Sequence, residues 1–83
     1  MLQSPKVEML APNQFVIYYK NQKTFQSYDS IIAIVENNKI TLDKYTWDYS
    51  TTTGKYRNQF LGETKKETQH KIDNGTYKLD DLN

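Results

Sequence analysis

The segment from Tyr45 to Leu61 most constrains how this chain folds, because two structural periods meet in it. Aromatic residues stand at alternate positions, Tyr45, Trp47 and Tyr49, which is the spacing of an extended chain. Four consecutive hydroxyl residues beginning at Ser50 follow directly, and such side chains are typical of a helix N-terminus. We therefore expect strands before this segment and helices after it, with Trp47 wedged between the sheet and the first helix.

Residues 14–43 carry the pattern of an antiparallel β-meander. They contain short runs of β-branched and aromatic residues separated by turn-forming residues. Asn37-Asn38 supplies two residues that tolerate a positive φ, as a tight hairpin requires. The runs expected as strands are Gln14–Lys20, Thr24–Tyr28, Ser30–Glu36 and Lys39–Asp43. Residues 1–13 precede them as an extended lead-in, within which Lys6–Ala11 is a further candidate strand.

The second half of the chain changes to a helical period. Ser50 is placed to cap a helix over residues 50–62, and Gly62 is placed to end it. Tyr56 and Phe60 lie four positions apart, so they share one face of this helix. That aromatic face is the expected cover of the sheet.

A second helix is predicted over residues 64–73. Thr64 and Glu67 have the spacing of a capping box, in which each side chain accepts a hydrogen bond from the backbone N–H of the other residue. The helix has few apolar residues, so we expect it to lie on the surface. The tail, residues 76–83, is expected either to add an edge strand or to fray.

Together these elements predict one α+β domain that spans residues 1–83. A chain of this length has a modest core, and a sheet must cover at least one of its faces. The predicted fold is a small antiparallel β-meander of three to five strands, followed by two short helices packed on one face.

Composition narrows the function. The 11 basic and 10 acidic residues leave a net charge of +1, whereas proteins that bind phosphate backbones usually carry a strong basic excess. The absence of cysteine excludes disulfides and thiolate metal sites. No secretory signal opens the chain, and no apolar run reaches the roughly 18 residues of a membrane span. We therefore expect a cytoplasmic protein with no membrane partner.

An enzymatic role is not expected. His70 is the only histidine, and it lies in a lysine-rich stretch where nothing is placed to converge on it. The ten carboxylates are scattered, without a spacing that predicts a shared acid–base or metal site. We predict a non-enzymatic domain with no cofactor and no bound metal.

The helix entrance Ser50–Lys55 also has the composition of an anion site. Hydroxyls and free backbone N–H groups at a helix start, with Lys55 and Arg57 nearby, suit a phosphate. The first glycine of a phosphate-binding loop is missing, however, and Tyr56 stands where that motif has Ser or Thr. Helix capping is the preferred interpretation. A protein that binds or sequesters a phosphate ligand, as an oligomer, is kept as the third hypothesis.

Seven tyrosines exceed what so small a core can enclose. Exposed Tyr is typical of protein interfaces, because its ring gives contact area at little entropic cost. The predicted partner-binding residues are Trp47, Tyr49, Lys55, Tyr56 and Arg57. A nucleic-acid-binding accessory protein, the alternative, would combine stacking rings with cations. Its predicted residues are Tyr18, Lys20, Lys23, Lys55, Arg57 and Lys65.

Residues 27–62 resemble a small uncharacterised domain that recurs in proteins of bacteriophages and related mobile elements. That family has a strand opening with S-Y-D/N-S/T and a hairpin, then W-D-Y-S-x-T-T-x-K and an aromatic–Leu pair on a helix. The matching residues are Tyr28, Asp29, Trp47, Asp48, Tyr49, Ser50, Thr52, Thr53, Lys55, Phe60 and Leu61. The resemblance implies a phage-type accessory protein or inhibitor, which binds a host or defence protein stoichiometrically in the host cytoplasm.

The leading hypothesis is therefore a non-enzymatic protein-binding module of phage type. Its contact is expected through a sheet edge or through the aromatic patch around Trp47–Tyr56. Nucleic-acid binding is the second hypothesis, and phosphate-ligand binding is the third.

Overall fold

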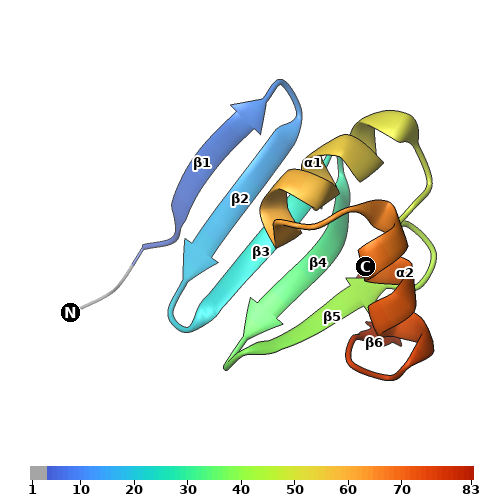
Figure 1. Cartoon of the computed structure of the whole chain (residues 1–83). Helices are drawn as coiled ribbons and strands as arrows, with labels where there is room; N and C mark the ends of the chain where they lie inside the picture. Colours follow the sequence, from blue (N-terminus) through green and yellow to red (C-terminus); the bar gives the residue numbers. More distant parts are fainter. Residues whose placement is uncertain (1–3) are drawn as a thin grey trace.

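A six-stranded sheet with two helices on one side makes up the fold of the computed structural model, which describes residues 4–83 (Figure 1). The strands follow one another across the sheet in chain order, from β1 at one edge to β6 at the other. The elements are β1 (Lys6–Ala11), β2 (Gln14–Tyr19), β3 (Gln22–Ser27), β4 (Ser30–Glu36), β5 (Lys39–Asp43), α1 (Thr51–Leu61), α2 (Lys65–Asp73) and β6 (Lys78–Asp80).

The predicted α+β class is confirmed. Strands β1 to β5 form an antiparallel meander, and β6 lies parallel to β5 after the two helices. Within the expected lead-in, residues 1–13, the candidate strand Lys6–Ala11 is β1; residues 1–3 lie outside the described part of the chain.

Each of the four hairpins of the meander contains a residue with a positive φ. The expected turn at Asn37 and Asn38 has φ values of 52° and 64°, and Asn13 joins β1 to β2 with a φ of 65°. Lys20 and Tyr28 adopt φ values of 56° and 54° in the other two turns, although a Cβ disfavours this region. Tight turns of this type keep the five meander strands in sequential register.

The buried face of the sheet is a continuous row of register partners. The row crosses four strands and consists of Val16, Phe25, Ala33 and Leu42, each buried. A register shift opposite Phe25 leaves Ile32 as an extra residue, so that Ile32 and Ala33 are both fully buried. The ring of Phe60 on α1 stacks on Phe25 with a centroid distance of 5.6 Å. This contact places α1 over the middle of the sheet.

Local capping chemistry sets the helix ends as predicted. The Ser50 hydroxyl accepts a hydrogen bond of 3.1 Å from the Thr53 backbone N–H at the start of α1, and Gly62 ends that helix with a φ of 70°. The capping box between Thr64 and Glu67 is complete at the start of α2.

The C-terminal tail is fixed, because Asp43 and Ile31 bind it. One Asp43 oxygen accepts a hydrogen bond of 2.8 Å from the Leu82 backbone N–H, while the other accepts from the loop that follows β5. Asn83 exchanges two hydrogen bonds with the Ile31 backbone, at 2.7 and 2.9 Å. For residues 76–83 we expected an edge strand or a frayed tail. The edge strand is observed as β6, and the residues after it are held by these hydrogen bonds.

Candidate interaction surfaces

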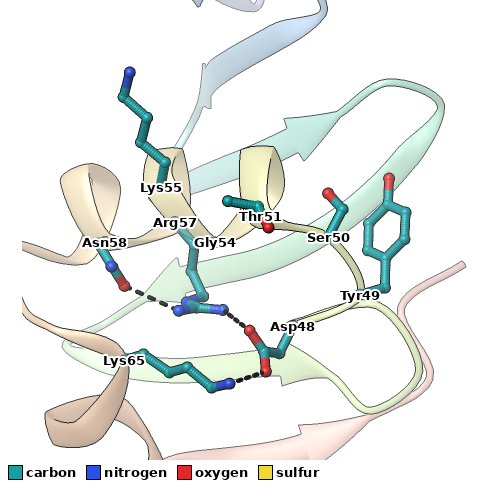
Figure 2. A pocket seen from close by; sticks show the side chains of 9 residues that line it. All are labelled: Asp48, Tyr49, Ser50, Thr51, Gly54, Lys55, Arg57, Asn58 and Lys65. Carbon is teal, nitrogen blue, oxygen red and sulfur yellow. Dashed lines mark hydrogen bonds and ion pairs between the residues drawn. The ribbon is translucent and has the colours of Figure 1, made fainter.

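An open cleft of about 640 Å³ lies at the entrance to α1 (Figure 2). Its walls are the loop Asp48–Thr51, the turn of α1 around Gly54 and Arg57, and Lys65 from the start of α2. Hydroxyl side chains, three cations and one carboxylate line this cleft. The cleft contains most of the residues predicted from the helix entrance.

Arg57 forms the floor of this cleft and is fully buried. Its Nη1 donates to the Trp47 carbonyl oxygen at 2.6 Å and to Asp48 Oδ1 at 3.2 Å, and its Nη2 donates to Asn58 Oδ1 at 2.9 Å. The guanidinium carbon also lies 5.1 Å from the centre of the Trp47 ring. Arg57 therefore ties the loop to α1 and presents no exposed surface for a partner.

Asp48 is the internal anion of the cleft. Besides Arg57, it binds Lys65, whose Nζ lies 2.7 Å from Asp48 Oδ2. Burial raises the pKa of Asp48, but hydrogen bonds and charges from Lys65 and Arg57 outweigh it and hold the pKa below the ordinary 3.8. The side chain of Lys55 points away from this pair, as Figure 2 shows. A phosphate at the helix entrance would therefore have to compete with the Asp48 carboxylate for its cations.

The structure divides the five predicted partner-binding residues. Trp47 and Tyr56 are half-buried and pack against the hydrophobic core, and Arg57 is buried. Tyr49, with 47% of its surface exposed, and Lys55 remain open to solvent. The expected aromatic patch is thus partly core, because the helix uses its rings to cover the sheet.

The residues of the nucleic-acid alternative fall into two groups. Tyr18 and Lys23 are register partners near the β2–β3 hairpin, which also carries Lys20. Lys23 Nζ lies 5.0 Å from the centre of the Phe60 ring, and Lys20 Nζ lies 5.3 Å from the Tyr19 ring. The other group, Lys55, Arg57 and Lys65, lines the cleft described above. The cations of both groups already contact rings or Asp48.

A second polar cluster, which sequence reasoning missed, fastens α2 to the end of the chain. Glu63 accepts hydrogen bonds from the Tyr77 hydroxyl, from Lys71 Nζ at 3.0 Å and from Thr68 Oγ1 at 2.8 Å. Burial raises the pKa of Glu63, but these three donors hold it below the ordinary 4.5. The pKa of Tyr77 is raised by burial and by Glu63, and the pKa of Lys71 is raised by its bond to Glu63. Each member has a partner, which is the signature of a structural network.

His70 lies exposed on α2. Within residues 4–83, no group of three or more His, Asp or Glu side chains is arranged to hold a metal ion. The titratable groups with shifted pKa values are engaged in the two clusters above or bind the C-terminal tail through Asp43.

The face of the sheet opposite the helices carries an apolar surface that the sequence analysis did not single out as a binding site. One row of register partners crosses it as Val7, Ile17, Thr24, Ile34 and Thr41, and a second as Met9, Phe15, Gln26 and Ile31. We call these nine residues the open face. Val7 and Met9 are 59% and 64% exposed, and none of the nine belongs to the core that the helices cover. The sequence of β2 indicates an apolar second face, because apolar residues occupy both alternations of this strand.

Comparison with known proteins adds the family. No curated protein and no solved structure matches the chain at a significant level. Among the described residues, no helix has the length and apolar character to cross a membrane. A family profile matches residues 5–75, which include both rows of the open face and the entire helix-entrance cleft. The chain therefore belongs to DUF8033, a family of unknown function.

Proposed function

We propose that this domain is a non-enzymatic protein-binding module and that the open face of its sheet is the contact surface. The observation that carries the proposal is the apolar character of that face, where Val7 and Met9 are exposed at the margin and Ile17 and Ile34 lie half-exposed nearer the centre. Apolar surface that a domain leaves open in this way is typical of a protein interface.

The two candidate surfaces differ in what they offer a ligand. In the helix-entrance cleft, Arg57 and Lys65 both pair with the single carboxylate of Asp48, which offsets one of their two positive charges. On the open face, the central positions carry Ile and Thr side chains, which bind by burial of area rather than by charge. This difference favours a protein partner over a nucleic acid or a free phosphate ligand.

The proposal extends to the mode of action. The domain would act by stoichiometric binding, as an accessory protein or inhibitor acts on a host or defence component, in the cytoplasm. Support for that mode comes from the resemblance of residues 27–62 to a phage and mobile-element domain, and from the absence of cysteine.

A comparison of variants tests the proposal. The tagged domain is incubated with bacterial lysate after nuclease treatment, and bound proteins are quantified for the wild type, for Ile17→Thr/Ile34→Thr and for Tyr45→Thr. Thr already occupies two positions of the same row, so the double variant retains the strand pattern. The control removes a ring that is 69% exposed in the loop after β5.

The expected result is a stoichiometric protein that the wild type and the control retain and the double variant loses. Circular dichroism of all three proteins establishes that each is folded. Equal retention by the three would reject the open face as the contact surface. Partners that disappear with nuclease would favour the nucleic-acid alternative instead.

A further inference from the structure

Strand β1 forms one edge of the sheet and pairs on its inner side with β2. The opposite edge, β6, has three residues, whereas β1 has six. Among the described residues no further strand lies beyond β1, so its outer N–H and C=O groups are open to pairing. Pro5 precedes the strand, and a register shift between Met9 and Ala11 interrupts it. The regular edge is therefore confined to Lys6–Met9.

The charges of this edge are opposite on the two sides of Val7. Lys6 and Glu8 flank Val7, point to the helix side of the sheet and are both exposed. Neither has an ion-pair partner among residues 4–83. If two β1 strands pair antiparallel with Val7 opposite Val7, each Lys6 stands opposite a Glu8. Opposite charges at such positions stabilise a strand pair.

Neighbouring registers lack this complementarity. A shift of two residues in one direction places Glu8 opposite Glu8, and a shift in the other places Lys6 opposite Lys6. Like charges directly opposite each other destabilise a strand pair. The charge pattern therefore favours one register. In that register a two-fold axis, which passes between the two Val7 residues, relates the two strands.

We propose that the partner of the β1 edge is a second copy of this chain, paired antiparallel about Val7. The two sheets then continue into each other, with both open faces on the same side. Val7 and Met9, the most exposed apolar residues of β1, gain neighbours from the other copy. This inference deepens the proposed function, on which it rests for the role of the joined surface: the dimer presents one apolar face twice as wide to the protein partner.

Charge reversal tests the register. The variants are Lys6→Glu and Glu8→Lys, and sedimentation velocity on the purified full chain measures the dimer dissociation constant. Each variant alone places like charges opposite each other at both positions, and we expect its dimer to weaken about tenfold. An equimolar mixture of the two pairs Glu at position 6 with Lys at position 8, and Lys at position 6 with Glu at position 8, so the dimer should return as a heterodimer.

Lys66→Glu is the matched control, because it changes the net charge as Lys6→Glu does at an exposed position of α2. It should leave the dissociation constant unchanged. A wild type that stays monomeric at every concentration, or a mixture that fails to recover the dimer, would overturn the proposal. Neither outcome would contradict the open face as a binding surface for another protein, because the lysate comparison tests that proposal separately with substitutions in β2 and β4.

Discussion

The two faces of the sheet differ in what covers them: helices pack on one face, and the other is open. On the covered face, Val16, Phe25, Ala33 and Leu42 form a row that α1 seals with Phe60. On the open face, the rows through Ile17 and Phe15 occupy the other alternation of the same strands, and no helix covers that face (Figure 1). The covered face contains the buried core, while the open face has an apolar surface that no helix of the described residues covers. This difference teaches where to look for a partner.

Charged groups follow the same division. Arg57 and Glu63 lie on the helix side, and each forms three side-chain hydrogen bonds to neighbouring groups, while Arg57 Nε has no partner among the described residues. A buried charge that loses its partner destabilises the fold strongly. These two residues therefore hold neighbouring elements together, and we call them fasteners. The open face has no charge at its central positions, which is the expected composition of an interface core.

The largest effect is expected from truncations on opposite sides of β4. Ile32 is fully buried, and Ile32→Ala should lower the free energy of unfolding by about 4 kcal/mol through lost burial and the cavity left behind. Ile34, half-exposed on the open face, is the matched control, and Ile34→Ala should cost about 1 kcal/mol. Urea denaturation measures both, and equal losses would show that the second face is also packed.

Removing the fastener in the cleft should have the next largest effect. Arg57→Met keeps the apolar stem of the side chain but leaves the Trp47 carbonyl without its Arg57 donor and Asp48 with Lys65 alone, and we expect a loss of about 3 kcal/mol. Lys55→Met on the exposed side of α1 is the control, with a change within about 0.5 kcal/mol. A small effect at Arg57 would mean that the loop holds its position without the ion pair.

Glu63→Gln tests the second fastener. The neutral amide loses the ion pair with Lys71 and gives the Tyr77 hydroxyl only an uncharged acceptor, so the free energy of unfolding should fall by about 2 kcal/mol. Glu36→Gln at the exposed end of β4 provides the matched comparison and should leave stability unchanged. Loss of stability in both variants would point to a general charge effect.

The pH dependence of stability should follow the same cluster. Glu63 has a lowered pKa, so its contribution is complete above the ordinary 4.5 and is lost as the pH falls through the lowered value. Tyr77 and Lys71 have raised pKa values, so their contributions are complete below the ordinary 10.0 and 10.5 and are lost as the pH rises through the raised values. Thermal unfolding across this range should give a plateau that falls at both ends; Glu63→Gln should reduce the loss at each end.

The smallest effect concerns a polar side chain on the covered face. Gln14 is fully buried opposite Ser27, and neither of its amide atoms has a hydrogen-bond partner among the described residues. Gln14→Met has nearly the same volume and removes the unpaired groups, so it should raise the free energy of unfolding by about 1 kcal/mol. A loss of stability would indicate that the amide is bound after all. Thermal denaturation of the wild type and the variant determines the sign of this change in the free energy of unfolding.

Local chemistry made much of the fold predictable from the sequence. The hairpin at Asn37 and Asn38, the Ser50 cap and the Thr64–Glu67 capping box depend on neighbours within a few residues, and all three are confirmed. Contacts between distant segments were harder. The fixed tail depends on Asp43 reaching Leu82 across 39 positions, which no local pattern reveals.

The sites were less predictable for the same reason. Arg57 looked like a surface cation, because the sequence does not show that the Trp47 carbonyl and Asp48 would fold back onto it. The sequence predicted both helices on one face and so left the other face open, but it did not single out that face as a binding surface, because apolar residues on both alternations of β2 are also typical of a strand covered on both sides. Whether a second face is covered depends on how many helices the rest of the chain provides, which is a property of the whole topology.

Photo-crosslinking from each side of the molecule tests the central claim most directly. Benzoylphenylalanine replaces Tyr19, which lies at the end of β2 in the same alternation as Ile17, or Tyr45 in the loop after β5; both rings are exposed. The adducts are identified after irradiation in bacterial lysate. The account predicts a defined protein adduct from position 19 that is absent from position 45 and disappears when Ile17→Thr/Ile34→Thr is added. Adducts from position 45 alone, or adducts unaffected by the open-face substitutions, would contradict it.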